Sequence, residues 1–487
     1  MHSWIVDHLK THFDTIQAHL DNDESLRLSA LAAAKASGNA DVSFGLVSSD
    51  ATADSLPCII IKITASDAGG KMKSTISAGA QKDALFSLSA RSEDWQTCLV
   101  SNEKLVRPYQ SYWGMLRVLG PEHKEVCVLG DLTAFARYAR VWRIALDRIR
   151  DAVTEIPLAQ SGAQITLPEE ENISEDHIIG RYTWINHSEY GAVKIFYETS
   201  GPSNPSPQIP TLLFLHTAGS DSRQYHTLMN NPTLLTRCKM VAFDLPAHGR
   251  SSLGTTQHPD SYSLTEQSYL ESINLVATHL KLTNVIICGA SMAGHVCLAA
   301  AIAATNKEFT FPLIGAIPCE ATAHLPLTQP IYEISGLDAA ILDPERVCGM
   351  IAPSSPEYYK RQIWWQYSSQ GTGVFAGDLK FYFRGWDGRG RVEKIDTSCV
   401  PVYMLTGVFD YSCSVVASRE TAEVIKGEGE GNVVFEEMDG LGHFPLTENP
   451  GFVLPFLVRA LEYIVGKHRD GKGEKAGEGG GGVQVGT

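Results

Sequence analysis

The chain has 487 residues, more than one ordinary hydrophobic core holds and enough for two or three domains. Its 55 Asp and Glu residues outnumber its 40 Lys and Arg residues, and the resulting net charge of −15 argues against a nucleic-acid partner. No run of about 18 apolar residues occurs and the first residues do not form a signal peptide, so we expect no membrane span and a cytoplasmic protein.

Residues 1–155 have the pattern of a separate domain. Helices are predicted at 3–20, 24–37, 104–118 and 132–153, and strands at 41–48, 58–64, 71–78, 84–90 and 126–131. Because helices and strands are segregated along the chain, we expect an α+β domain with an antiparallel sheet.

Three stretches of this domain carry a resemblance to a known fold. FSLSARSEDWQ, SYWGMLRVLG and VLGDLTAFARYARVW resemble the sterol carrier protein type 2 fold. The resemblance implies an apolar tunnel for a lipid or an acyl chain. The alternative is an unrelated α+β domain that serves dimerisation.

After an acidic linker at 156–180, strands alternate with helical patterns. Such alternation of apolar strands with helices predicts a doubly wound, mostly parallel α/β sheet. The gap before the sixth strand is rich in aromatic residues, and we expect a helical cap at about 321–398. The glycine-rich tail, 467–487, is predicted to be disordered. The predicted strands are 193–198, 211–216, 238–244, 284–290, 312–318, 401–406 and 432–438.

A serine stands where one of these strands becomes a helix, in VIICGASMAGHVC. A nucleophile elbow needs a strand, a tight turn that carries the serine, and then a helix, with very small residues two positions before and after the serine. Gly289 and Ala293 occupy those positions around Ser291. The alternative is that the small residues only let the helix pack against the sheet. The pattern favours Ser291 as a nucleophile.

An oxyanion loop is predicted in FLHTAGSD, residues 214–221, which follows an earlier strand. Backbone N–H groups at Thr217 and Met292 are the predicted donors to a developing oxyanion. His248, in FDLPAHGRSS, is a tempting base, but its early position in the chain favours a structural role.

An acid and a histidine follow in the order that a serine triad needs. Asp410 ends the stretch YMLTGVFD, and His443 lies in DGLGHFPLTENP after the next strand. His443 would accept the proton of Ser291, and Asp410 would fix the tautomer of the imidazole. Glu320, after the preceding strand, is the alternative acid.

Together, LHTAG, FDLPAHGRSS, GASMAG, LTGVFD and GLGHFPLTENP resemble the α/β-hydrolase superfamily over residues 181–466. The resemblance implies a serine hydrolase fold with an inserted cap. The methionine beside the nucleophile, Met292, is a feature in which the chain also resembles carbon–carbon bond hydrolases of ring-fission products and many esterases.

The substrate is predicted to be a small apolar molecule, because 355–390 holds ten aromatic residues that would roof the site. Candidate substrate-binding residues are His216, Glu320, Trp365 and Phe375. No metal set, P-loop or dinucleotide motif is present, so we expect no cofactor. Arg361, Arg384 and Arg389 are candidates for binding a carboxylate, but are better explained as surface residues.

The sequence therefore predicts an esterase, lactonase or thioesterase that acts on an acyl or polyketide-like substrate through an acyl-enzyme. A carbon–carbon bond hydrolase with the same triad would need an arginine facing Ser291. A lipid-binding or scaffolding protein with a relictual hydrolase domain is the alternative without catalysis. The oligomeric state is left open.

Overall fold

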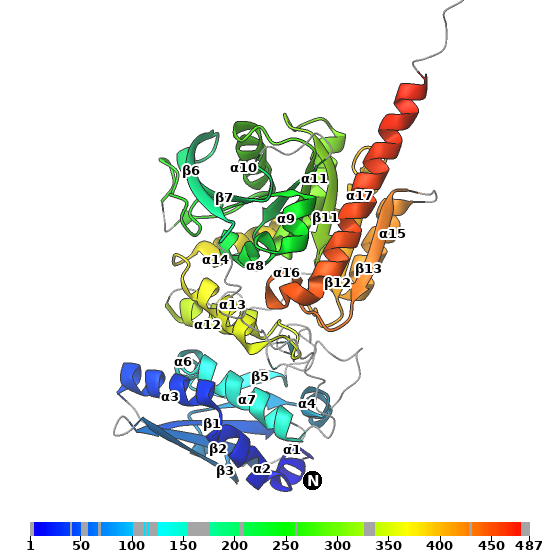
Figure 1. The fold of residues 1–487 in the computed structure, drawn as a ribbon. Coiled ribbons are helices and arrows are strands. Elements are labelled where there is room, and N and C mark those ends of the chain that lie inside the picture. The colour runs from blue at the N-terminus through cyan, green and yellow to red at the C-terminus, as the bar shows by residue number, and fades with distance from the viewer. Residues whose placement is uncertain are drawn as a thin grey trace, which may run out of the picture. The chain divides into compact units, whose positions relative to one another are not determined.

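The structure is a computed structural model that describes residues 4–38, 41–49, 57–66, 70–100, 112, 114–115, 125–153, 176–203, 209–258, 261–325, 337–427 and 431–478. The chain forms two compact units (Figure 1). Unit 1 comprises residues 1–160 and 328–354, and unit 2 comprises residues 161–327 and 355–487. Most of the predicted helix at 104–118 and of the predicted linker at 156–180 lies outside the described residues.

Unit 1 is built on a five-stranded sheet in the order β3-β2-β1-β4-β5. The predicted antiparallel arrangement is wrong for one pair, because β1 and β4 are parallel and β2–β3 is a hairpin inserted between them in the sequence. The strands are β1 (Asp41–Ser48), β2 (Pro57–Ser66), β3 (Lys71–Ala80), β4 (Phe86–Ala90) and β5 (Cys127–Gly130).

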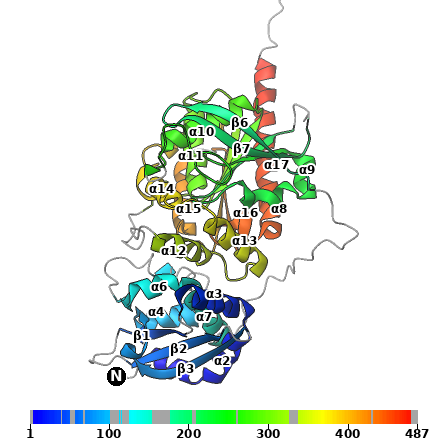
Figure 2. The ribbon, with the colours of Figure 1, turned by 90° about the vertical axis from the view of Figure 1, so that its left-hand side faces the viewer.

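Helices of unit 1 pack on one face of this sheet (Figure 2). Two predicted helices are divided in the structure, one between residues 10 and 13 and the other at Tyr138. Helix α4 was not predicted. The helices are α1 (Trp4–Lys10), α2 (Phe13–Asp21), α3 (Glu24–Ser37), α4 (Ser92–Leu99), α6 (Leu132–Arg137) and α7 (Ala139–Val153).

Aromatic side chains fill the described interior of unit 1. Trp142 of α7 stacks on Phe135 with ring centroids 5.0 Å apart, and Trp95 of α4 stacks on Tyr112 at 5.6 Å. All four side chains are buried. The resemblance to the sterol carrier fold, with its lipid tunnel, stays a prediction.

Helix α12 (Leu337–Cys348) lies within the range predicted as the cap, yet it packs in unit 1 against α6 and α7. Leu342 is buried in the core of that unit. Glu345, which is 1% exposed, accepts a 2.5 Å hydrogen bond from the Arg143 guanidinium of α7. The segment 321–398 is therefore divided between the two units.

Unit 2 contains an eight-stranded sheet in the order β13-β12-β11-β10-β8-β9-β7-β6. Within this order, the six strands from β13 to β9 are parallel to one another. At the other end of the sheet, β7 is antiparallel to β9, and the edge strand β6 is antiparallel to β7. The seven predicted strands are confirmed, and β6 was missed. Their bounds are β6 (Ile179–His187), β7 (Gly191–Ser200), β8 (Thr211–Leu215), β9 (Lys239–Phe243), β10 (Val285–Ala290), β11 (Leu313–Cys319), β12 (Val402–Gly407) and β13 (Val433–Met438).

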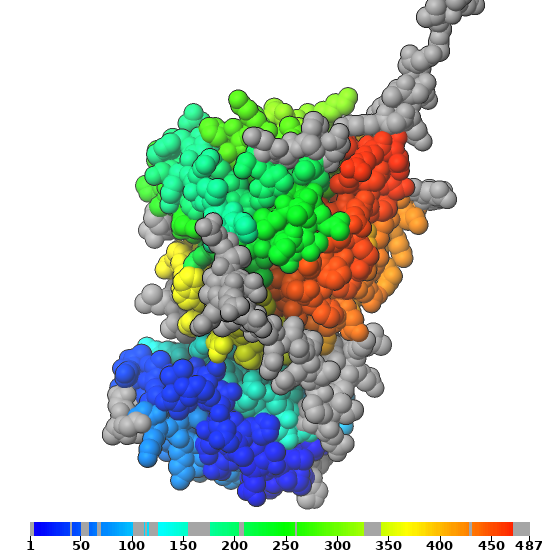
Figure 3. Space-filling model, viewed as in Figure 1, coloured from blue at the N-terminus to red at the C-terminus, as the bar shows by residue number. Residues whose placement is uncertain are grey.

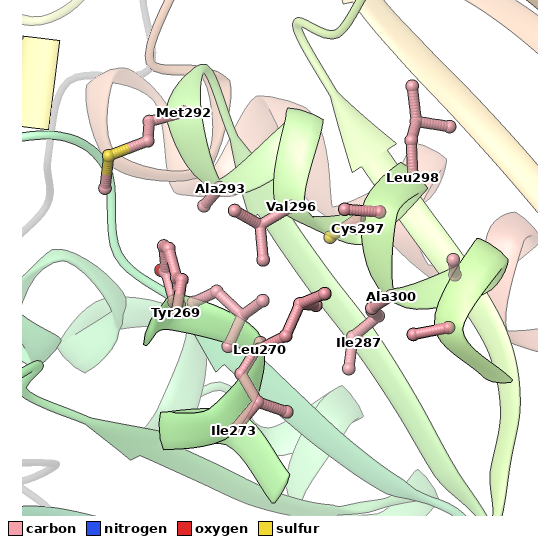
Figure 4. Packing of buried hydrophobic residues seen from close by; sticks show 14 of the residues in the cluster. Tyr269, Leu270, Ile273, Ile287, Met292, Ala293, Val296, Cys297, Leu298 and Ala300 are labelled. Carbon is pink, nitrogen blue, oxygen red and sulfur yellow. The ribbon is translucent and has the colours of Figure 1, made fainter. Parts of the chain in front are cut away.

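Both faces of the central strands are covered by helices, so every residue of β10 is buried. Ile287 faces the core formed with α10 (Glu266–His279) and α11 (Met292–Thr305), and Ile286 and Cys288 face the opposite core. Figure 4 shows side chains of α11, such as Val296, and of α10, such as Leu270 and Ile273, in one buried cluster. The small residues of α11 allow this close packing.

The opposite face carries α8 (His226–Met229), α9 (Pro232–Arg237) and α17 (Pro450–Glu478). Arg237 of α9 pairs with Glu462 of α17 at 2.6 Å, and Figure 3 shows these segments in green and red along one face. Helix α17 runs as far as Glu478, into the tail predicted to be disordered from 467, although this stretch contains three glycines, which disfavour a helix. No helix among the described residues is long and apolar enough to cross a membrane.

The remaining part of the predicted cap belongs to unit 2. It contains α13 (Glu357–Ser368), α14 (Val374–Lys380) and a π-helical turn at Phe381–Gly385. Helices α15 (Val415–Lys426) and α16 (Pro445–Glu448) follow β12 and β13. Helix α13 of the cap contacts α16, and the cap thus lies beside the carboxyl ends of the parallel strands.

Candidate active site

Ser291 occupies a strained turn between β10 and α11. Its backbone has φ 61° and ψ −124°, a left-handed conformation that costs an L-residue about 1–3 kcal/mol. Its N–H donates to the Cys319 carbonyl of β11 at 3.1 Å, which holds the turn against the sheet. The strain indicates that the turn exists to present this side chain.

The glycines around the serine are required by close backbone approach. A Cβ atom on Gly289 would lie 2.5 Å from the Ala293 Cβ and 2.7 Å from the Leu215 carbonyl. A Cβ atom on Gly294 would lie 2.1 Å from the Cys319 carbonyl. Alanine at 293 fits because its methyl group fills the space above Gly289.

The structure brings together the serine, the histidine and the predicted acid. His443 Nε2 lies 2.7 Å from Ser291 Oγ, and His443 Nδ1 lies 2.8 Å from Asp410 Oδ2. Ser291 is 5% exposed, and His443 and Asp410 are each 2% exposed. In this geometry the serine hydroxyl donates to Nε2 and Nδ1–H donates to the carboxylate.

Asp410 sits in a turn that supplies hydrogen-bond donors. The backbone N–H groups of Ser412 and Cys413 donate to its two oxygens at 2.6 and 3.1 Å. Burial alone would raise the pKa of Asp410, but the charge of His443 and the hydrogen bonds from His443, Glu320 and Ser412 outweigh it and lower the pKa. Asp410 is therefore held as a carboxylate.

Glu320 is a buried neighbour of Asp410, the predicted triad acid. It is fully buried, and its Oε1 accepts a hydrogen bond from Gly407 N–H at 2.8 Å. It is close enough to Asp410 for the charge of the aspartate to raise its pKa. The alternative acid predicted at this position thus lies beside Asp410, whereas Asp410 contacts His443.

The predicted oxyanion donor at Thr217 is wrong in detail. Its N–H donates to Gln224 Oε1 at 2.9 Å, so this group is already used inside the loop. Among the hydrogen bonds of the described residues, none uses the N–H of Ala218 or of Met292. The two candidate donors are therefore Ala218, one residue further along the loop, and Met292.

His216 is buried and serves the backbone rather than a substrate. Its Nε2 accepts from Leu245 N–H at 3.0 Å, and its Nδ1 lies 3.0 Å from the Thr217 carbonyl. Burial, and next the neighbouring His248, lower its pKa to about 4. Both nitrogens of this neutral ring are thus occupied, which contradicts the predicted role in substrate binding.

A buried acid of the cap reaches the oxyanion loop. Asp378 of α14 accepts hydrogen bonds from Gly219 N–H at 2.7 Å and from the Tyr262 hydroxyl at 2.8 Å. Its Oδ2 also lies 2.8 Å from His248 Nε2. Burial would lower the pKa of His248, but the charge and the hydrogen bond of Asp378 act against burial, and this pKa is raised. His248 thus contacts a buried acid of the cap, and its structural role stays a prediction.

The two predicted aromatic residues of the cap differ in position. Trp365 is 52% exposed, with the Arg223 guanidinium 4.6 Å above its ring, so it is a surface residue and its predicted role is wrong. Phe375 lies against the oxyanion loop, because a Cβ atom on Gly219 would be 2.4 Å from its ring.

An aromatic row continues from Phe375 through Tyr367, one of the ten predicted aromatic residues, to Phe444, which was not predicted at the site. The Tyr367 ring lies 5.7 Å from that of Phe375 and 5.8 Å from that of Phe444, the residue after His443. The Tyr367 hydroxyl lies 2.5 Å from Thr217 Oγ1. Helical spacing marks such residues as buried, but only the fold reveals which neighbour they meet.

His295, one turn after the nucleophile, is a further buried histidine. It stacks between Tyr382 and Trp386, with ring centroids 5.0 and 5.7 Å away. Its Nδ1 has no hydrogen-bond partner among the described residues. Burial, followed by the charge of His443, lowers its pKa to about 3, so the ring is neutral. Within the described ranges, no group of His, Cys, Asp and Glu residues is arranged to hold a metal ion.

Several solved structures are similar to part of this chain. An enol-lactonase from Burkholderia xenovorans LB400 has 16% identity and a TM-score of 0.46, over 57% of this chain and 100% of the other. A thermophilic esterase from Thermogutta terrifontis has 18% identity and a TM-score of 0.45, over 58% and 99%. A putative aryl esterase from Burkholderia cenocepacia has 14% identity and a TM-score of 0.47, over 59% and 100%.

No curated protein matches the chain. The family model described as "Alpha/beta hydrolase family" matches residues 212–455. This range runs from β8 to the first turn of α17 and contains Ser291, Asp410 and His443. The chain belongs to the alpha/beta hydrolase family.

Proposed function

We propose that the protein is a serine hydrolase that cleaves a carboxylic ester, a lactone or a thioester of an apolar acyl group. The observation that carries this proposal is the position of His443, whose two nitrogens lie 2.7 Å from Ser291 Oγ and 2.8 Å from Asp410 Oδ2. A strained serine in contact with a buried, oriented imidazole is the arrangement that activates a hydroxyl.

The proposed reaction has two stages. The Ser291 Oγ–H bond breaks as its proton passes to His443 Nε2, and Oγ bonds to the carbonyl carbon. The N–H groups of Met292 and Ala218 stabilise the oxyanion, and the imidazolium then protonates the departing alcohol or thiol. Water, deprotonated by His443, attacks the acyl-enzyme and releases the acid.

The aromatic row supports an apolar acyl group. Phe375, Tyr367 and Phe444 form a row of rings that leads from the oxyanion loop to the residue after His443. Rings in such a position favour apolar or aromatic groups and keep water from the site.

The carbon–carbon bond hydrolase receives less support. It needs a cation facing Ser291 to bind a carboxylate, and the three candidate residues Arg361, Arg384 and Arg389 are all exposed. Arg389 pairs with the exposed Asp387 at 2.6 Å. A non-catalytic scaffold would have no use for the strained serine.

Labelling with a fluorophosphonate, read by intact mass, tests the proposal. We expect one adduct on the wild type, none on Ser291→Ala and much slower labelling of His443→Ala. A panel of acyl esters, lactones and acyl-thioesters would then identify the substrate class. A folded wild type that takes no adduct would refute the proposed function.

A further inference from the structure

Glu320 is held in an unusual conformation directly behind the triad acid. It follows β11 with φ 50°, a left-handed conformation that is strained for a residue with a side chain. Its N–H donates to the Leu405 carbonyl at 2.9 Å, and the preceding carbonyl, of Cys319, accepts from Ser291 N–H. The backbone of Glu320 is therefore fixed between β12 and the turn that holds the nucleophile.

One oxygen of the two neighbouring carboxyl groups, Glu320 and Asp410, has no hydrogen-bond donor within the described part of the chain. Asp410 accepts from His443, Ser412 and Cys413, and Glu320 Oε1 accepts from Gly407. The second oxygen, Glu320 Oε2, meets no donor among the described residues. Two ionised carboxylates cannot hydrogen-bond to one another, so a hydrogen bond from Glu320 Oε2 to the neighbouring Asp410 would need a proton on Glu320.

We propose that Glu320 is a neutral carboxylic acid at neutral pH, and that its Oε2–H donates to Asp410 and positions it for His443. Glu320 is thus a positioning residue, and the role rests on the proposed function of the triad. The proton stays on Glu320 during catalysis, while the proton that moves passes from Ser291 Oγ to His443 Nε2.

The electrostatic surroundings favour this protonation state. Burial, and next the negative charge of Asp410, raise the pKa of Glu320 well above its usual value. The titratable groups that face it are Asp410, from the turn after β12, and Cys319, on its own strand. No Lys or Arg of the described residues forms an ion pair with Glu320, whereas Asp410 has His443.

A neutral donor suits the chemistry better than a second anion. It satisfies an Asp410 lone pair without adding charge to a buried site. It also lowers the basicity of Asp410, so the aspartate remains a carboxylate beside the imidazolium formed by His443 and does not take the Nδ1 proton. An ionised Glu320 would repel Asp410 and leave a buried charge without a partner.

Infrared difference spectroscopy locates the proton directly. The spectrum of wild type minus Glu320→Gln, at a pH above neutrality, should contain the carbonyl stretch of a protonated carboxylic acid, with a shift in D₂O. The matched control is Glu198→Gln, which removes a buried glutamate paired with Arg250 and His226 and should yield carboxylate bands only. Carboxylate bands alone from Glu320→Gln would overturn the proposal.

Labelling rates as a function of pH test the positioning role. The side-chain amide introduced by Glu320→Gln can accept from Gly407 and donate to Asp410, so this variant should keep the labelling rate within about threefold of the wild type. Glu320→Ala should lose at least about tenfold, with its acid limb moved to higher pH. Equal rates and acid limbs in the two variants would remove the role. Absence of any labelling of the wild type would refute the hydrolase instead, while the infrared result would still stand.

Discussion

The carboxylate of Asp378, on α14 of the cap, accepts a 2.7 Å hydrogen bond from the Gly219 N–H of the oxyanion loop. Gly219 has φ 62°, and Phe375, three residues before Asp378, covers it. The cap therefore does more than roof the site, because its buried acid fixes the loop that contains Ala218 N–H. His248 and Tyr262 hold the same carboxylate from the other side.

This contact predicts that Asp378→Asn lowers kcat by about 10- to 100-fold with a smaller change in KM, because a displaced oxyanion donor acts in the transition state. Steady-state kinetics on a substrate found in the ester panel provide the measurement. Asp387→Asn is the control, since Asp387 forms an exposed ion pair with Arg389 and its loss should leave kcat unchanged. A rise in KM alone for Asp378→Asn would contradict the assignment.

The choice between two candidate acids leads to a second prediction. Asp410→Asn should lower kcat by about 10³- to 10⁴-fold. The amide can donate to His443 Nδ1, which favours the tautomer with the proton on Nε2, and this tautomer cannot accept the proton of Ser291. Glu320→Gln should have a far smaller effect on kcat. If the two variants were equally impaired, Glu320 would share the role of triad acid.

The proximity of the three residues of the proposed triad could be predicted from the sequence, because each of them follows a strand closely. Parallel strands bring their carboxyl ends to one edge of a sheet, so Ser291, Asp410 and His443 had to lie near one another once β10, β12 and β13 were recognised. The edge strand β6 was missed because its outward residues, such as Trp184, are exposed and do not give a buried-strand pattern.

The contacts between distant segments could not be predicted in the same way. Asp378 lies 159 residues after Gly219 in the sequence, and its burial depends on the packing of α14. Thr217 was a reasonable oxyanion donor until the fold brought Gln224 to its N–H. Likewise, nothing in the sequence of α12 distinguishes a cap helix from one that completes unit 1.

The neutral His295 predicts a loss of stability in acid. Its pKa is lowered from 6.5 to about 3 in the folded protein, so below pH 6.5 the unfolded chain binds the extra proton and folding stability falls as pH falls. The free energy of unfolding then falls by up to about 1.4 kcal/mol for each pH unit. His295→Phe, which can stack between Tyr382 and Trp386, should reduce the slope by about that amount in urea unfolding between about pH 6 and pH 4. An unchanged slope would indicate that His295 is protonated when folded.

The backbone approach at the elbow predicts a strong effect of a single methyl group. In Gly294→Ala the new Cβ would lie 2.1 Å from the Cys319 carbonyl, which itself holds Ser291 N–H. We expect a loss of at least about 2 kcal/mol of unfolding free energy together with slower fluorophosphonate labelling. Gly466→Ala is the control, because nothing lies within 4 Å of its Cβ and alanine favours a helix. Equal stability of the two variants would contradict the tight packing at Gly294.

The buried pair of Arg143 and Glu345 predicts how α12 depends on the rest of unit 1. Arg143→Met removes the closer partner of Glu345, which is 1% exposed, and leaves it the ion pair with Arg140 at 3.7 Å. Breaking a buried ion pair by removing one partner costs about 3 kcal/mol or more, so α12 should be released from α7 and become sensitive to proteolysis. Combining Arg143→Met with Glu345→Leu should restore much of the protection, because the charge that needed a partner is gone. Hydrogen exchange at Leu342 provides the measurement, and full protection in Arg143→Met would show that the apolar contacts of α12 suffice to hold it.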